Sequence, residues 1–392
     1  MRRHILIFVA LVLAISGCAT TRLAPVSSGD VAFEQDEKRL WARAKEETDA
    51  LKNGGVLYED HALNRYLNQV ARKLVPADTF RSIPFVIHVI RNPHLNAFTM
   101  PDGAIYIHTG LLARMENEAQ LATLLAHEMT HATHRHAIRE FRSTRNKAAF
   151  FATMSFTIGS VPVVGGLTNL MGSLGSRAAI SGYSQAMETE ADTEGFHLLR
   201  RAGDDPTEAP KLFDHLLDDT KEEGVAEPFF FGTHPRLSER IGNYTRLIKD
   251  LPPAARKGAR HPEAFLDATR RLLLENAHLD IKAGRFGPAE RAAKKSLASR
   301  PKTAGAHLVL GDIYRQRNAE GDMDLAKTHY TRAIGLDATN PAPHKGLGLV
   351  HYRLGDKAAA KKALRAYLTG APSAPDRGYV EETIRQIDGR TQ

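Results

Sequence analysis

The spacing of apolar positions changes several times along the chain, and each change predicts a different element. Residues 34–51 follow a charged, helical pattern, and residues 61–74 place apolar side chains at helical spacing. Two short apolar runs, 85–90 and 104–107, are typical of strands. We therefore expect a small sheet, followed by a long helix that begins near Asn117.

Residues 148–176 break this pattern because they contain no charged side chain. Their length would suffice for a membrane span, but several glycines, a proline and many Ser and Thr residues argue against one. The segment favours a buried hairpin or a flap over a cleft. A loop that touches the membrane is the alternative.

The last third of the chain is wholly helical and repeats. It follows a stretch rich in proline and alanine, residues 251–260, which we interpret as a linker. Small residues recur in a fixed register, with units of about 34 residues that are typical of tetratricopeptide repeats. The glycines stand at the turns, the alanines five residues later, and the closing residues twelve further on: Gly284, Gly321, Gly355, Ala289, Ala326, Ala360, Pro301, Ala338 and Pro372. Residues 261–392 are thus predicted to form a short all-α solenoid with a capping helix at 381–387. Generic helical hairpins are the alternative.

Length and composition limit the classes of protein that fit. A chain of 392 residues is too long for one ordinary core, so two domains are expected. The net charge of +8 is spread over helices whose basic and acidic residues alternate. No concentrated basic stripe exists, and we expect no nucleic-acid partner.

The N-terminus predicts export. Arg2 and Arg3 precede an apolar run over residues 5–15, and small residues follow, as in a secretory signal covering residues 1–17. Cys18, the only cysteine, ends a stretch that resembles a bacterial lipobox, in which the cysteine is lipidated and begins the mature protein. An ordinary cleaved signal with an incidental cysteine is the alternative.

Lipidation at Cys18 would determine where the protein resides. Its acyl chains would anchor the protein to a membrane, with residues 18–35 as a tether. Since Ala19 rather than an aspartate follows the cysteine, resemblance to enterobacterial sorting implies the periplasmic side of the outer membrane of a Gram-negative bacterium.

The stretch from His127 to His131, His-Glu-Met-Thr-His, predicts a metal site. Histidines four residues apart on one helix project to the same side, and Glu128 can reach a water bound to the same metal. Zinc suits such a site, because it accepts nitrogen and oxygen ligands and keeps one position for water. It lowers the pKa of that water, and Glu128 is then placed as the general base.

A zinc site with two histidines needs a third protein ligand, and the stretch from Glu188 to Asp192 offers carboxylates. Glu188 and Glu190 point to different sides of a helix and cannot both serve. Glu188 shares a face with Asp192, which could accept a hydrogen bond from a ligand imidazole. If Asp192 has that role, Glu188 is the third ligand.

With both motifs, residues 36–250 resemble the gluzincin metallopeptidases related to HtpX and the prenyl-protein (CAAX) protease. The resemblance implies a mainly α fold with a small β-sheet, one Zn²⁺ per chain, and Glu188 as third ligand. It also implies that Asn96, Ala97 and Phe98 lie on an edge strand that binds the substrate backbone. The C-terminal repeats make the layout similar to periplasmic members of the family, and the lipobox is closer to its lipoprotein members.

The segment Thr233-His234-Pro235, followed by Arg240, matches a further element of this family. The resemblance implies that His234 lies near the metal, either donating to the oxyanion or occupying the open position of zinc, with Arg240 as a second candidate to steady the oxyanion. A surface turn is the alternative for His234. The spacing of His134 and His136 does not place them with His127 and His131, so we interpret both as surface or structural residues.

The sequence therefore predicts a zinc-dependent endopeptidase of the cell envelope, acting in quality control of misfolded or stalled envelope proteins. Unfolded or misassembled envelope proteins would be its substrates, and outer-membrane assembly machinery is a candidate partner of the repeats. The alternative is a chaperone or scaffold that acts through the repeats, whose surfaces bind proteins, with a latent zinc site.

Overall fold

The structure is a computed structural model that describes residues 23–26, 32–143, 183–222 and 237–389. Cys18, His234 and the uncharged segment 148–176 lie outside the described residues.

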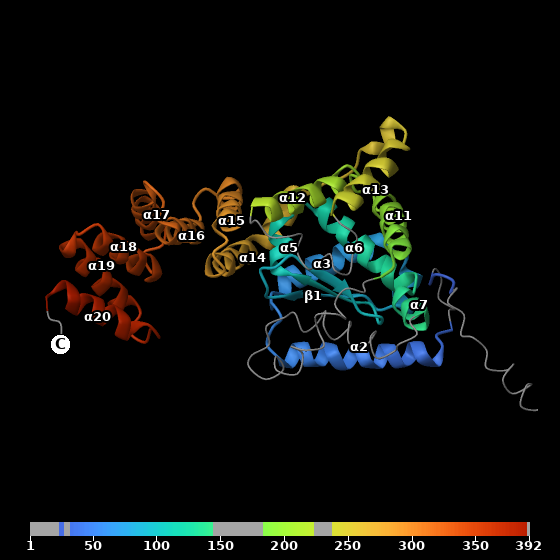
Figure 1. The fold of residues 1–392 in the computed structure, drawn as a ribbon, viewed down its shortest axis with the longest axis horizontal. Coiled ribbons are helices and arrows are strands. Elements are labelled where there is room, and N and C mark those ends of the chain that lie inside the picture. The colour runs from blue at the N-terminus through green and yellow to red at the C-terminus, as the bar shows by residue number, and fades with distance from the viewer. Residues whose placement is uncertain (1–22, 27–31, 144–182, 223–236, 390–392) are drawn as a thin grey trace, which may run out of the picture.

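The described chain forms an N-terminal lobe and a C-terminal helical arm, which extends away from the lobe (Figure 1). The lobe contains, in chain order, α2 (Gln35–Asn53), α3 (His61–Leu74), α4 (Ala77–Ser82), β1 (Val86–Ile90), β2 (Ala97–Thr99), β3 (Ala104–His108), α5 (Thr109–Arg114), α6 (Glu118–Thr133), α7 (His136–Ser143), α11 (Gln185–Arg201), α12 (Glu208–Glu222) and α13 (Leu237–Lys249). After a short 3₁₀ helix η2 (Pro253–Arg256), the arm contains α14 (Pro262–Lys282), α15 (Phe286–Ser299), α16 (Ala304–Arg317), α17 (Asp322–Leu336), α18 (Ala342–Arg353), α19 (Lys357–Gly370) and α20 (Arg377–Ile387).

The sheet has three strands in the order β1-β3-β2. β3 pairs in parallel with β1 and antiparallel with β2, whose residues 97–99 oppose 107–105. Within the described chain β2 pairs with β3 alone, so it forms an edge of the sheet.

Helices cover both faces of this sheet (Figure 1). On one face α2 packs Ala44 and Leu51 against Phe98 and Tyr106, and the Tyr106 hydroxyl lies 2.7 Å from that of Thr48. On the other face α3 and α6 enclose the main core. Every residue of α6 is buried, which is expected of a helix that is surrounded by other elements.

The arm consists of helix pairs α14–α15, α16–α17 and α18–α19, with α20 packed on the last pair. Gly284, Gly321 and Gly355 stand at the turns of these pairs with φ of 74°, 78° and 83°, a conformation that glycine adopts without strain. Gly311 and Gly346 pack against the ring of Tyr330, where a Cβ would collide. A mainly α chain with a small sheet, followed by helical repeats, confirms the predicted fold class.

Helix α14 belongs to both parts of the molecule. Its residues Phe265, Leu272 and Leu273 are buried in the core of the lobe, whereas Ala277 and Ile281 join the core of the arm. The sequence placed a boundary at residues 251–260, but the lobe core extends beyond it. Of the helices in the described ranges, none combines the length and apolar character that crossing a membrane requires.

Candidate metal centre

The two histidines of the predicted motif lie on α6, in the interior of the lobe. The side chain of Asn117 caps this helix by accepting from the backbone N–H of Gln120. His127 and His131 follow one turn apart, and their Nε2 atoms are 3.0 Å from each other. Both side chains are at most 1% exposed, so neither serves as a surface residue.

Helix α11 brings a carboxylate to these two nitrogens. The Glu188 oxygens lie 3.4 Å from Nε2 of His127 and 3.6 Å from Nε2 of His131. One ligand atom from each of the three residues lies within 4.8 Å of the others. Two imidazole nitrogens and a carboxylate oxygen form a donor set that catalytic zinc uses, so these residues fit the ion.

Gly195 lets α11 approach α6 at the position of the motif. A Cβ on Gly195 would lie 3.0 Å from the backbone nitrogen of His127 and 3.1 Å from the carbonyl carbon of Ala126. Any larger residue would therefore push the helix that carries Glu188 away from the helix that carries the histidines. This glycine lies one turn beyond the acidic motif and was not predicted from the sequence.

Asp192 supports His127 from the side opposite Glu188. Its Oδ1 lies 3.0 Å from Nδ1 of His127 and accepts from Nη2 of Arg240 at 2.7 Å, and Asn243 donates to its Oδ2 at 3.2 Å. Burial alone would raise the pKa of Asp192, but the Arg240 guanidinium and His127 hold it well below its usual range. Asp192 therefore stays ionised and can fix the tautomer of His127 with Nδ1 protonated and Nε2 free.

Arg240, the second candidate to steady an oxyanion, lies in the interior of the lobe against Asp192. Its side chain is fully buried and donates to Asp192 through both Nε and Nη2. Its guanidinium also lies 4.2 Å from the ring centre of Phe213. Arg240 thus contacts the carboxylate that faces His127 and helps to keep it ionised.

His131 is supported in the same way, by a residue that the sequence reading kept apart from it. His136 is fully buried, and its Nδ1 lies 2.8 Å from Nδ1 of His131. Its Nε2 lies 3.3 Å from Glu190, which accepts from Arg139 at 2.9 Å. Burial lowers the pKa of His136 to about 4, so its ring is neutral and can accept from one partner while donating to the other.

His136 is therefore a buried structural residue, and it reaches His131 because the helix is interrupted between them. α6 ends at Thr133, and Arg135 adopts φ of 56°, in the left-handed region. This turn folds the chain back, so that α7 starts with His136 beside His131. His134, by contrast, is half-buried and contacts the Thr133 hydroxyl.

Glu128 faces the edge strand of the sheet. Its Oε2 lies 2.7 Å from the hydroxyl of Thr99, the last residue of β2. Its other oxygen, Oε1, is buried and has no hydrogen-bond partner among the described residues. Tyr183 stacks its ring on that of His131, with 4.2 Å between the ring centres. Neither the contact of Thr99 with Glu128 nor that of Tyr183 with His131 was predicted from the sequence.

The strand predicted to bind substrate is the edge strand β2. The carbonyl of Asn96 and the N–H of Met100 bond to β3, and such bonds alternate along an antiparallel strand. The main-chain groups of Ala97 and Thr99 therefore point to the open edge. The Phe98 side chain packs instead on Tyr106, with 5.0 Å between ring centres, so its contribution to the site is through the backbone.

Two parts of the chain match known protein families. Residues 61–247 match the profile of peptidase family M48, and residues 274–341 and 319–375 match that of the tetratricopeptide repeat. The beta-barrel assembly-enhancing protease of Escherichia coli is 30% identical over 209 residues, which cover 52% of this chain and 42% of that protein. A putative beta-barrel assembly-enhancing protease of Vibrio cholerae is 28% identical over 59% of this chain and 48% of its own. The mitochondrial metalloendopeptidase OMA1 of Schizosaccharomyces pombe is 29% identical over 56% of this chain and 62% of its own.

The matched region covers less than half of the length of these two bacterial relatives. A solved tetratricopeptide protein of Thermus thermophilus, 22% identical, covers 33% of this chain and 74% of its own, with a TM-score of 0.28.

Proposed function

We propose that this chain, whose residues 61–247 form a domain of peptidase family M48, is a zinc-dependent endopeptidase. The observation that carries the proposal is the buried convergence of His127, His131 and Glu188 within 4.8 Å, on two helices that Gly195 holds close together. These three side chains would hold one zinc ion. When bound, zinc supplies a Lewis acid that polarises a peptide carbonyl and makes a water acidic near neutral pH.

Glu128 has the geometry of a general base. The Thr99 hydroxyl holds its Oε2, which leaves Oε1 to accept a proton from the attacking water. The same carboxyl group can then deliver that proton to the leaving amine. Because Thr99 belongs to β2, the strand that would hold the substrate also fixes the orientation of the base.

The open edge of β2 offers a place for an extended substrate. Ala97 and Thr99 direct an N–H and a carbonyl each away from β3, and a substrate backbone can pair with these groups as an added strand. Recognition through the main chain tolerates many side chains, which suits a peptidase that acts on unfolded polypeptides. Asn96 would define the start of this binding strand and Phe98 would brace it from the sheet face.

We infer the role in the cell from the relatives and from the N-terminus. The bacterial relatives are named for enhancing beta-barrel assembly, and we infer a related task for this chain, the removal of misfolded or stalled envelope proteins. Lipidated Cys18 would place it on the periplasmic side of the outer membrane, and the repeats would contact the assembly machinery. His234 would act at the metal, as an oxyanion donor or as a ligand in a resting state.

Metal removal tests the proposal directly. The purified chain should contain about one zinc ion and cleave unfolded casein, lose cleavage when a chelator removes the ion, and regain it when zinc returns. A chain that never cleaves casein, yet suppresses aggregation of an unfolded protein with or without metal, would instead favour the chaperone function. The repeats are the feature that favours that second candidate.

A further inference from the structure

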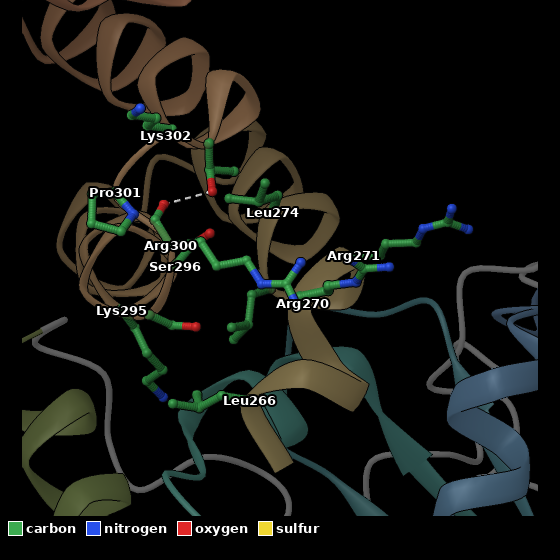
Figure 2. Close-up of a pocket in the computed structure, with 12 residues that line it drawn as sticks. Leu266, Arg270, Arg271, Leu274, Lys295, Ser296, Arg300, Pro301 and Lys302 are labelled. Atoms are coloured by element: carbon green, nitrogen blue, oxygen red, sulfur yellow. Dashed lines mark hydrogen bonds between the residues drawn. The ribbon is translucent and has the colours of Figure 1, made fainter. Parts of the chain in front are cut away.

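A pocket of about 830 Å³ lies at the base of the arm, between α14 and α15 where the chain turns into α16 (Figure 2). It is far along the chain from the metal centre and shares no residue with it. Leu266, Leu274 and Pro301 supply apolar wall, and Ser296 and Thr303 supply hydroxyl groups. The volume falls in the range of pockets that bind ligands, which is about 300–1,000 Å³.

The charged side chains around this pocket all carry the same sign. They are Arg270, Arg271, Lys295, Arg300 and Lys302. Arg300 pairs with Asp267, and Lys295 donates to the backbone carbonyls of Ala113 and Met115. Arg270, Arg271 and Lys302 are exposed and make no ion pair or hydrogen bond within the described parts of the chain. The pocket therefore presents an excess of cationic donors.

A neighbouring pocket does not share this excess of positive charge. The second pocket, of about 470 Å³, lies between α5, α12 and α15 and is lined by both signs of charge. There Asp219 accepts from Arg114 at 2.9 Å and from Arg291 at 2.5 Å. Carboxylates of the second pocket pair with its arginines, whereas Arg270, Arg271 and Lys302 of the first pocket have no carboxylate partner among the described residues and are available to an anion.

We propose that the basic pocket binds an acidic, extended segment of a client polypeptide. Carboxylates of the segment would meet Arg270, Arg271 and Lys302, and its apolar side chains would lie on Leu266 and Leu274. The apolar wall and the volume exceed what a single anionic group needs. A bilayer surface cannot follow a concave pocket, but an extended chain can.

If the chain is the peptidase proposed above, the position of the pocket would let a bound client be presented for cleavage. α14 carries Arg270 and Arg271 on the pocket side and buries Phe265 and Leu272 in the core of the lobe. The pocket is thus fixed to the lobe that holds the metal centre. A client held there would be tethered to the lobe that carries the edge strand, which would raise its effective concentration at the site of cleavage.

Binding can be measured without cleavage on the full chain carrying Glu128→Gln. The probe is a fluorescent peptide of about ten residues that alternates Glu and Leu, compared with the same peptide carrying Gln for Glu. The acidic peptide should bind about tenfold more tightly or better, and added salt should weaken it. Arg270→Gln with Arg271→Gln should cost about tenfold in affinity. Lys362→Gln with Arg365→Gln, which removes two exposed cations from α19, should cost nothing.

Equal affinity for the two peptides, or equal losses of affinity in the two double variants, would overturn the proposal. A third result would also overturn it: the variant with Arg270→Gln and Arg271→Gln no longer binds anionic phospholipid vesicles but still binds the acidic peptide as wild type does. The last result would assign the pocket to lipid headgroups. Failure of the peptidase function is distinguishable, because a wild-type chain that cleaves nothing would still bind the acidic peptide. With an active chain, the same double variant should lose the preference for an acidic over a neutral substrate, whereas Lys362→Gln with Arg365→Gln should keep that preference.

Discussion

The Nδ1 atom of His131 lies 2.8 Å from the Nδ1 atom of His136, which in turn contacts Glu190 through Nε2. A neutral His136 can accept from His131 and donate to Glu190, which would orient the ring of His131 and keep its Nε2 free for the proposed metal. Substitution His136→Ala should therefore weaken zinc binding by about 10–100-fold, as measured by competition with a chromogenic chelator.

His134→Ala is the matched control, because His134 is a neighbouring histidine that contacts Thr133 and not a predicted ligand. The zinc affinity of Glu190→Gln should lie between those of the His136 and His134 variants, since an amide oxygen can still accept from His136. Equal zinc affinity in the His136 and His134 variants would show that the ring of His131 needs no such support.

Gly195→Ala should also weaken zinc binding, although the residue touches no ligand atom. The added Cβ meets the backbone of Ala126 and His127 at 3.0–3.2 Å, so α11 must move away by a few tenths of an ångström. Glu188 would then lie too far from the two imidazoles. Zinc affinity should fall about tenfold with helix content unchanged by circular dichroism. Gly242→Ala, where a Cβ meets nothing within 4 Å, should leave zinc affinity as it is.

A truncated chain should keep a folded lobe only if it retains α14 and α15. A chain that ends at Arg260 loses Phe265, Leu272 and Leu273 from the lobe core, at about 1.5–3 kcal/mol each. It also leaves Arg114 without Asp280, which binds it at 2.9 Å. That fragment should unfold or aggregate, whereas a chain that ends at Lys302 should fold and melt cooperatively. Two equally stable fragments would show that α14 contributes nothing to the lobe.

Asp204 should make stability fall as pH rises. Burial, together with the nearby Glu118 carboxylate, raises the pKa of Asp204 to about 6 from 3.8. The folded chain therefore binds this proton more tightly than the unfolded chain, and stability is lost between about pH 4 and pH 6. Asp204→Asn should gain roughly 1–2 kcal/mol in the free energy of unfolding above pH 6, after allowing for solvent screening, and nothing near pH 4.

The adjacent Asp205 provides a control of opposite sign. It accepts from Arg260 at 2.7 Å and from Thr207, and although burial raises its pKa, these partners lower it overall. Asp205→Asn should therefore lose stability at neutral pH, with the loss shrinking as pH falls below about 4. Denaturant unfolding at several pH values measures both variants. A higher free energy of unfolding at neutral pH in both variants would contradict these opposite expectations.

Much of this fold could be predicted from the sequence, because local patterns determine it. Helix α3 runs over the predicted residues 61–74, and α6 begins beside Asn117 as the pattern indicated. The repeat register predicted glycines at the turns of the three helix pairs, and in the structure these three glycines adopt positive φ. The resemblance to a known peptidase family was likewise confirmed by the match over residues 61–247.

What the sequence could not provide are contacts that depend on how elements meet. Thr99 reaches Glu128 because a strand edge packs against a helix, and Gly195 matters only because α11 crosses α6 at His127. His136 reaches His131 only after the left-handed turn at Arg135. None of these relationships has a periodic signal along the chain.

The central claim is that Glu128 activates water beside a metal held by His127, His131 and Glu188. Its most direct test is Glu128→Gln, compared with wild type for zinc content and for cleavage of unfolded casein. The amide keeps the shape of the side chain and its contact with Thr99 but cannot accept a proton. The account predicts about one zinc ion in both proteins and a loss of cleavage of about 10²–10⁴-fold or more in the variant. Near-normal cleavage by the zinc-loaded variant would contradict it.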